Sequence, residues 1–211
     1  MGIPQQVFLP FCILPLVETV VAIHTAIQMT FPEDKELLNQ IRAGNERAFT
    51  DLYNKHRRRL LAYCFRLLQD RATAEDAVQV AFQKAYESLN SLDKPELFFY
   101  WLYSIARNEV YGAIRKTRKN GTTSSIEDEK DIWDEETPLE LIVKTELAEL
   151  VQYHLNHLKV EYREVLVLRQ YDRLTYAEIA AITGATISSV ESRLFKARKA
   201  LAKKLEPYFR Q

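Results

Sequence analysis

Polar side chains near the end of the chain have the types and spacing that suit binding to nucleic acid. Six lysines or arginines lie between Arg193 and Lys204, although the 211-residue chain has no net charge. Cationic side chains bind phosphates or guanine edges, and short serines let a helix backbone approach the bases. The predicted contact set is Ser188, Ser189, Ser192, Arg193, Phe195, Lys196 and Lys199. The types and spacing of these residues indicate that they bind DNA.

Two helices joined by a glycine turn must position these side chains. We predict a short helix over Tyr176–Thr183, a turn at Gly184, which tolerates a positive φ, and a second helix capped by Thr186. The second helix has an apolar face formed by Ile187, Val190, Leu194, Ala197, Leu201 and Leu205. This is typical of a helix-turn-helix, whose second helix enters the major groove. The alternative is a helical hairpin with a solvated face.

The stretch LTYAEIAAITGATISSVESRLFKARKAL closely resembles the carboxy-terminal domain of extracytoplasmic-function sigma factors, the small alternative sigma subunits of bacterial RNA polymerase. The resemblance implies that this domain reads the minus-thirty-five element and docks on the polymerase β flap. By position, Glu191, Ser192, Phe195 and Lys196 fall where family members contact DNA. Glu191 is an acid where a base is frequent, and it can accept a hydrogen bond from a cytosine amino group. The promoter sequence is therefore not implied.

A second stretch, FFYWLYSIARNEVYGAIRKTRK over Phe98–Lys119, resembles the family segment that melts and reads the minus-ten element. Cations track a single strand and aromatic rings stack on its bases. The predicted minus-ten set is Trp101, Ser104, Arg107, Asn108, Tyr111, Arg115 and Arg118. The core-facing set is Leu102, Ile105 and Ala106, and core packing is the alternative for Trp101 and Tyr103. Asn108 matches the base-reading position, and the loop Asn90–Leu97 corresponds to where family members hold a flipped base.

The stretch AEDAVQVAFQKAY, Ala74–Tyr86, resembles the family's clamp-binding helix. The resemblance implies that Asp76, Gln79 and Gln83 bind the β-prime clamp of core polymerase. Val80 stands where the family usually has glutamate. Thr73 predicts the start of this helix, because its hydroxyl can accept a backbone N–H and acids follow it. The alternative is that these acids only cap a helix.

Charge divides the chain into blocks. Residues 1–34 carry −3, residues 35–119 carry +6, residues 120–140 carry −7 and residues 141–211 carry +4. We predict an all-α chain with a first domain at 34–119, an acidic flexible linker at 120–138 and a helix-turn-helix domain at 139–211. The linker is either an inert spacer or, by the resemblance, a strand that lies in the RNA path of the polymerase.

Residues 1–33 form an apolar extension that has no counterpart in the resemblance. No lysine or arginine precedes Lys35, which excludes a secretory signal. A membrane-spanning helix is disfavoured because Val7–Met29 is interrupted by Pro10, Pro15, Glu18 and His24. We favour translation from Met29. A hydrophobic tail that docks on a partner is the alternative.

No residue pattern indicates catalysis, a cofactor or a metal. His154 and His157 lie three residues apart without a third ligand, so a solvated pair is expected. Cys12 and Cys64 form neither a disulfide framework nor a CxxC site, which suits a cytoplasmic protein.

We therefore predict an alternative sigma factor and no enzymatic activity or small-molecule substrate. The resemblance implies three partners: core RNA polymerase, through its β-prime clamp and β flap, promoter DNA and an anti-sigma factor. One rival is a conventional helix-turn-helix regulator with an amino-terminal dimerisation or sensor domain. A second rival, a membrane-tethered interaction protein, rests on Val7–Met29.

Overall fold

The computed structural model describes residues 32–119 and 148–209, and every regular element in those ranges is helical. The predicted all-α class is confirmed. Residues 1–31 and the linker at 120–138 lie outside the described residues, so the interpretations placed on them stay predictions. None of the helices in the described ranges combines the length and apolar character that a membrane span requires.

The described residues fall into two compact units. The first contains residues 32–119 together with Thr175–Ile187, and the second contains 148–174 together with 188–209. The first unit therefore takes in the short helix α8 (Tyr176–Thr183), which lies against α5 (Phe98–Lys119). The predicted boundaries assign α8 to the second domain instead, and they stay a prediction.

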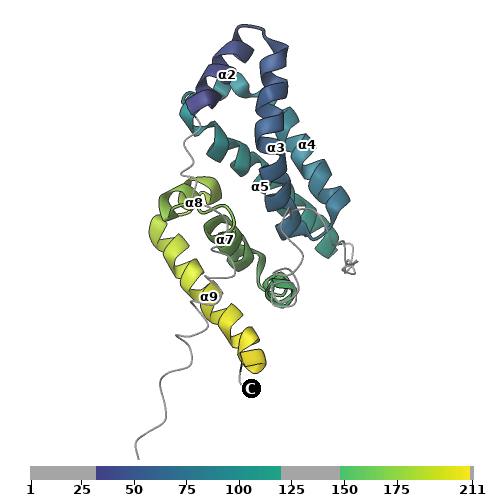
Figure 1. Cartoon of the computed structure of the whole chain (residues 1–211), viewed down its shortest axis with the longest axis vertical. Helices are drawn as coiled ribbons and strands as arrows, with labels where there is room; N and C mark the ends of the chain where they lie inside the picture. Colours follow the sequence, from purple (N-terminus) through teal and green to yellow (C-terminus); the bar gives the residue numbers. More distant parts are fainter. Residues whose placement is uncertain (1–31, 120–147, 210–211) are drawn as a thin grey trace, which may run out of the picture. The chain divides into compact units, whose positions relative to one another are not determined.

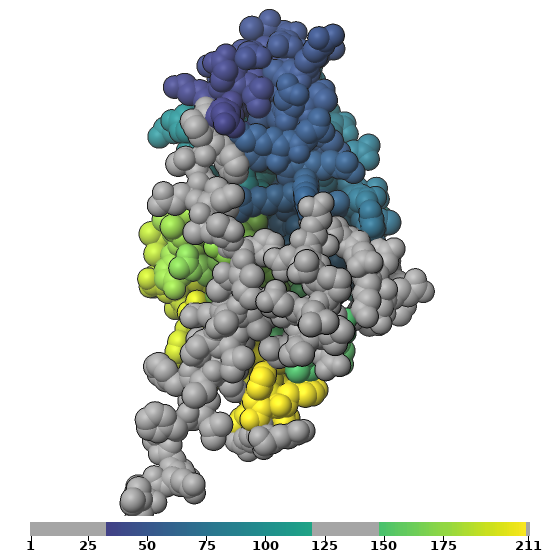
Figure 2. Space-filling view, viewed as in Figure 1, coloured from purple at the N-terminus to yellow at the C-terminus, as the bar shows by residue number. Residues whose placement is uncertain are grey.

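Residues 32–119 form a bundle of α2 (Pro32–Arg42), α3 (Glu46–Leu68), α4 (Arg71–Glu87) and α5, with α3 in contact with the other three (Figure 1). In the space-filling view α2 and α3 make a continuous surface (Figure 2). The largest fully buried side chains of the bundle are Leu38, Leu52, Leu60, Tyr63, Leu67, Phe98, Leu102 and Tyr103. Each leucine contributes about 1.5–3 kcal/mol by leaving water. Tyr103 thus belongs to the core.

The start of α4 differs from the prediction. Asp70 is the N-cap, and its carboxylate accepts a hydrogen bond from the Thr73 backbone N–H at 2.7 Å. Hydrogen bonds from the Thr73 hydroxyl and this N–H hold the pKa of the Asp70 carboxyl below its ordinary value. The prediction that Thr73 begins the helix was wrong, because the charged Asp70, three residues earlier, caps the helix and so places Thr73 inside the first turn.

A buried polar pair ties α2 to α3. His56 Nε2 lies 2.9 Å from Asp34 Oδ2, and the two side chains are 1% and 3% exposed. Lys55 Nζ reaches Asp34 Oδ1 at 3.0 Å and Glu33 Oε2 at 2.8 Å. Burial alone lowers the pKa of Lys55, but its hydrogen bonds to Glu33 and Asp34 raise it above the ordinary value. The pair is costly to bury and stabilises only while both partners are present.

The connection between α4 and α5 contains two short 3₁₀ turns, η1 (Leu89–Ser91) and η2 (Pro95–Leu97). Leu89 and Leu92 are 4% and 7% exposed, so their side chains anchor the connection to the bundle. Pro95 stands at the first position of η2, where a missing backbone N–H costs least. The predicted loop Asn90–Leu97 therefore has a defined shape.

The helix-turn-helix segment begins with α8 and continues into α9 (Ile187–Phe209). A capping box starts α8, in which Glu178 accepts the Thr175 backbone N–H at 2.6 Å and Thr175 accepts the Glu178 N–H at 3.3 Å. Gly184 ends α8 with φ 65°, a left-handed conformation that glycine adopts without strain. This glycine turn was predicted. Ile187, by contrast, is 50% exposed and does not belong to the buried face of α9.

The second unit contains a helical segment at 148–156, α7 (Val160–Gln170) and α9 from residue 188. The buried face of α9 consists of Val190, Leu194, Ala197, Leu201 and Leu205, at the predicted spacing. His154 is also buried, at 9% exposure, with its ring 5.4 Å from that of Tyr208. The expectation of a solvated histidine pair was therefore wrong for His154, although His157 is exposed.

We expect this unit to lose stability as the pH falls below about 6.5, the ordinary pKa of histidine. Burial, followed by the charges of Lys204 and His157, lowers the pKa of His154. Between the lowered folded pKa and 6.5 the unfolded chain binds more protons than the folded chain, so stability decreases with decreasing pH. Thermal unfolding at pH 7.5 and 5.5 measures this. His154→Leu should reduce the loss, whereas His157→Leu should retain it. Equal losses in the wild type and His154→Leu would contradict the assignment.

Candidate nucleic-acid interface

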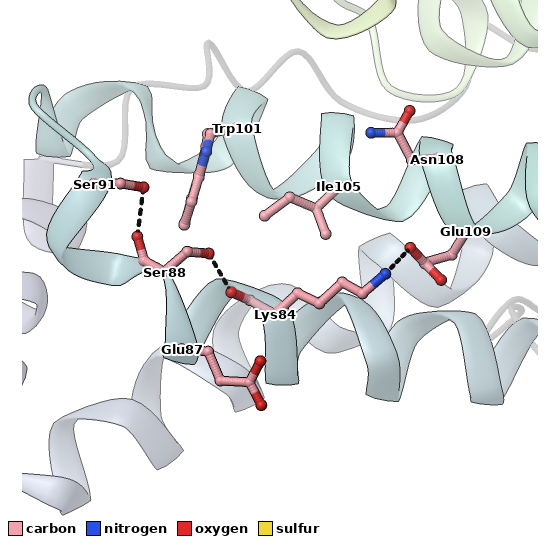
Figure 3. A pocket seen from close by; sticks show the side chains of 8 residues that line it. All are labelled: Lys84, Glu87, Ser88, Ser91, Trp101, Ile105, Asn108 and Glu109. Carbon is pink, nitrogen blue, oxygen red and sulfur yellow. Dashed lines mark hydrogen bonds and ion pairs between the residues drawn. The ribbon is translucent and has the colours of Figure 1, made fainter.

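A hollow of about 440 Å³ lies between α4, η1 and α5 (Figure 3). We call it the α4–α5 pocket. Trp101 and Asn108, both predicted for the minus-ten set, line it together, so the fold brings them to one place. The full lining is Lys84, Glu87, Ser88, Ser91, Trp101, Ile105, Asn108 and Glu109.

The floor of the pocket is closed by polar contacts within the protein. Lys84 Nζ on α4 donates to Glu109 Oε1 on α5 at 2.6 Å, which joins the two helices. The Ser88 hydroxyl donates to the Lys84 carbonyl, and the Ser91 hydroxyl donates to the Ser88 carbonyl at 2.7 Å. These donors are therefore already occupied.

Two groups at the pocket remain available to a ligand. Asn108 is exposed and makes no hydrogen bond to any residue that the structure describes, so its amide offers one donor group and one acceptor. The indole of Trp101 supplies a flat, half-buried ring. Trp101 and Ile105 point from α5 towards α4, whereas Asn108 stands at the rim with its amide directed outward (Figure 3). A flat polar ligand fits this combination.

The charges around the pocket disfavour a phosphate. Its lining holds the two carboxylates of Glu87 and Glu109 and one cation, Lys84, which is paired. Cations instead lie further along α5, where Arg115 and Arg118 are exposed near its carboxyl end. The arrangement suits a nucleobase in the pocket and a phosphate backbone along the second half of α5.

The rest of the predicted minus-ten set lies on a neighbouring strip of α5. The Ser104 hydroxyl donates to the Trp101 carbonyl at 2.7 Å and is thus engaged within the helix. The guanidinium of Arg107 lies 4.3 Å from the centre of the Tyr111 ring, both half-buried. Cation–π contact of this kind holds the ring flat beneath the cation. The strip presents a preformed aromatic and cationic surface.

One predicted core residue lies elsewhere. Ile105 was expected to face the core with Leu102 and Ala106, which are both fully buried, but Ile105 is only half-buried and lines the pocket. Helical spacing allows both placements, because residue 105 lies at the border of the buried face.

Sequence reasoning missed Lys84, Glu87, Ser88 and Glu109 as lining residues. Lys84 and Glu109 are 25 residues apart, and no periodicity within either helix marks them as partners. Of the predicted loop Asn90–Leu97, Ser91 lines the pocket. The acid–base pair becomes visible only when α4 packs against α5.

The predicted polymerase-binding residues share one face of α4. Asp76, Gln79 and Gln83 are all exposed, and the buried face of the helix is formed by Ala74, Ala77, Val78, Ala81, Phe82 and Ala85. The Gln83 amide donates to Glu87 at 2.9 Å. The three side chains are thus accessible to a partner.

The predicted minus-thirty-five residues lie along the outer side of α9. Phe195 is 69% exposed, so its ring is open to a partner. Ser189 and Arg193 are half-buried and flank this face. The exposed members of the set are Ser188, Glu191, Ser192, Phe195, Lys196 and Lys199.

Metal ligands do not cluster in the described ranges. No group of three or more histidine, cysteine or carboxylate side chains in residues 32–119 and 148–209 is placed to hold a metal ion. Cys64 is buried within α3.

Comparison with known families and proteins covers both halves of the chain. Residues 52–120 match the family described as Sigma-70 region 2, and residues 148–201 match Sigma-70, region 4. The RNA polymerase sigma-H factor of Pseudomonas aeruginosa is 29% identical over 87% of this chain and 99% of its own length. The ECF RNA polymerase sigma factor SigW of Bacillus subtilis is 31% identical over 81% of this chain and 96% of its own length.

Two solved structures are similar over most of the chain. CnrH in complex with the cytosolic domain of CnrY is 27% identical, with a TM-score of 0.63 over 82% of this chain and 97% of that one. The sigma factor RpoE in complex with the anti-sigma factor NepR, from Bartonella quintana, is 28% identical, with a TM-score of 0.60 over 75% of this chain and 96% of that one.

Proposed function

Because the chain belongs to the extracytoplasmic-function sigma factors of the sigma-70 family, we propose that its α4–α5 pocket and the outer face of α9 contact a promoter at two separate elements. As an alternative sigma factor it binds core RNA polymerase and promoter DNA and acts in transcription initiation. The proposal assigns these contacts to particular residues.

The α4–α5 pocket takes an unpaired base of the minus-ten element. The observation that carries this proposal is the presence of Trp101 and of the unpartnered amide of Asn108 in one hollow. A base that leaves the stack needs a ring to stack on and groups that bind its edge, and these two side chains supply both. Arg115 and Arg118 hold the phosphates of the same strand.

The outer face of α9 binds the major groove of the minus-thirty-five element. Its amino-terminal part carries the small side chains Ser188 and Ser192, which allow close approach of the backbone to DNA. Lys196 and Lys199 bind phosphates, and Glu191 accepts from a cytosine amino group. The glycine turn and capping box at the ends of α8 support the assignment, since they define the helix-turn-helix.

Arg193→Ala is expected to weaken binding to the minus-thirty-five duplex by about 1–3 kcal/mol if the side chain reaches a guanine, and to lower the salt slope by about one if it reaches a phosphate. Affinity of the polymerase complex for promoter fragments, measured at several salt concentrations, separates these outcomes. Association with core polymerase should not change. Lys35→Ala, which removes an exposed lysine of α2 outside the proposed DNA-binding faces, is the control. Wild-type affinity and slope for Arg193→Ala would contradict the assignment.

Core polymerase binds the exposed face of α4 through Asp76, Gln79 and Gln83. Their side chains project from a helix whose opposite face is buried in the bundle, so a partner can cover them without disturbing the core. Catalysis belongs to the polymerase, and this chain contributes no reacting group. We place the protein in the cytoplasm, where that partner acts.

An anti-sigma factor also binds this chain. The support is that the similar RpoE of Bartonella quintana was solved in complex with the anti-sigma factor NepR. A partner that covers the exposed faces of α4 and α5 prevents access to polymerase and DNA. We expect such a partner to co-purify with the chain and to release it before transcription begins.

In-vitro transcription with core polymerase and a library of promoters tests the function as a whole. The complex should start transcripts from a subset of promoters that core polymerase alone ignores, and the free chain should bind duplex DNA weakly. A conventional helix-turn-helix regulator instead binds a symmetric duplex site tightly without polymerase. Tight binding by the free chain, together with no promoter-specific transcripts, would reject the proposal.

A further inference from the structure

We infer that Arg42, on α2, is a positioning residue for the α4–α5 pocket, because it fixes the segment that forms one wall. We call residues Ser88–Leu92 the wall segment; it includes the lining residues Ser88 and Ser91. The inference rests on the proposed role of the pocket and adds a residue that does not line it. Arg42 is 47 and 50 residues from the two groups it binds.

The contact itself is a bridge from one nitrogen to two carbonyls. Arg42 Nη2 donates to the Leu92 carbonyl at 2.5 Å and lies 3.3 Å from the Leu89 carbonyl. These carbonyls flank the η1 turn, in which the Leu92 N–H donates to the Leu89 carbonyl at 3.2 Å. A guanidinium donates charge-assisted hydrogen bonds in a fixed planar geometry, so it sets both the position and the orientation of the turn.

The other contacts of the wall segment do not set its position and orientation relative to α2. The Ser88 and Ser91 hydroxyls bond to carbonyls of residues 84 and 88, so they shape the segment only relative to α4. The buried side chains of Leu89 and Leu92 hold the segment to the bundle without fixing its direction. Within the described part of the chain, Arg42 is the side chain that connects this segment to α2 by hydrogen bonds.

Position matters here because a binding pocket depends on sub-ångström placement of its walls. Ser91 and Trp101 line the same hollow from the wall segment and from α5 respectively. If the wall segment shifts, the width of the slot beside the Trp101 ring changes, although every lining side chain is still present. Loss of Arg42 should therefore weaken recognition of the base that the pocket holds and leave other promoter contacts unaffected.

A scan with abasic sites tests this. Promoter fragments are melted in advance across the minus-ten element, and one nucleotide at a time is replaced by an abasic site. The affinity of the full chain in complex with core polymerase is measured for each fragment. For the wild type, affinity should fall when the base held by the pocket is missing, and Asn108→Ala should remove most of that fall.

In Arg42→Ala, the loss of affinity caused by an abasic site at the same nucleotide should be at least about threefold smaller than in the wild type; a tenfold difference would correspond to 1.4 kcal/mol. The losses at all other nucleotides should be unchanged. Arg42→Lys, which replaces the planar fork with one ammonium, should lie between Arg42→Ala and the wild type. Arg47→Ala is the matched control, because Arg47 is an exposed arginine at the start of α3. Its profile should equal that of the wild type.

The outcomes separate the inference from the proposed function. If no abasic site lowers the affinity of the wild type, the proposed function of the pocket is wrong. If the wild type and Asn108→Ala behave as expected but Arg42→Ala keeps the wild-type profile, the positioning role is overturned and the pocket stands. If Arg42→Ala lowers the affinity for every fragment by the same factor, the positioning role is also overturned. If circular dichroism shows Arg42→Ala unfolded, Arg42→Lys decides, and a wild-type profile for it overturns the inference.

Discussion

Asn108→Ala is expected to impair promoter opening about fivefold or more, since a paired amide contact to a base edge is worth about 1–3 kcal/mol and each 1.4 kcal/mol is a factor of ten. Asn108 stands at the rim of the α4–α5 pocket without a hydrogen bond to any described residue. Its removal costs the fold little and costs the bound strand a specific contact. Association with core polymerase should be unchanged, because Asn108 lies on α5 and the proposed polymerase contacts lie on α4.

The measurement compares a duplex promoter with one melted in advance. The polymerase complex of Asn108→Ala should also bind the melted fragment less tightly than the wild type does, because the missing contact is to an unpaired base and not to the duplex. Asn54→Ala, an exposed asparagine on α3, is the matched control and should open promoters as the wild type does. Unchanged opening of the duplex promoter, together with wild-type binding to the melted fragment, would remove Asn108 from the proposed site.

His56→Ala should destabilise the first unit by about 3–5 kcal/mol, the usual cost of breaking a buried pair. Asp34, whose side chain is 3% exposed, would lose its buried partner at 2.9 Å and keep only the contact of Oδ1 with Lys55 at 3.0 Å. The ring of His56 also packs 5.7 Å from Phe98 and 6.0 Å from Phe99, so truncation leaves a space beside two core aromatics. Domains of this size are stable by about 5–15 kcal/mol, so the loss is a large part of the total.

Urea unfolding followed by circular dichroism measures this loss. Lys55→Ala removes the more exposed partner of Asp34 and should cost only about 1 kcal/mol. The double variant Asp34→Ala/His56→Ala should be less destabilised than the sum of the single variants, because neither polar group is then left alone. Additive losses, or a His56→Ala variant as stable as Lys55→Ala, would show that the pair does not act as a buried unit.

Features set by neighbouring residues could be predicted from the sequence alone. The glycine turn at Gly184 and the buried stripe of α9 depend on backbone preference and on helical period, both of which are local. The helix Phe98–Lys119 was expected from about Leu97 for the same reason. The assignment of Thr73 as the cap of α4 failed within this local range, because Asp70 offers a charged cap three residues earlier and its carboxylate accepts the Thr73 N–H.

Features that join distant residues could not be predicted in this way. The Lys84–Glu109 ion pair spans 25 residues, and Arg42 reaches carbonyls 47 and 50 residues away. No spacing within one helix marks such partners. The buried ring of His154 likewise lies beside that of Tyr208, which is near the end of the chain in sequence. Each contact exists because two helices pack, and the packing follows from the summed burial of many apolar side chains.

The amino-acid sequence by itself determined the helical class and the helix-turn-helix, since residue type and helical period carry that information. Its resemblance to the family's minus-ten segment marked Trp101 and Asn108 as base-binding candidates. Tertiary structure decided that these two side chains share a hollow, that Lys84 and Glu109 close its floor and that Arg42 holds its wall. The physical reason is that a pocket is formed by surfaces of several helices, and its shape depends on how their side chains interlock.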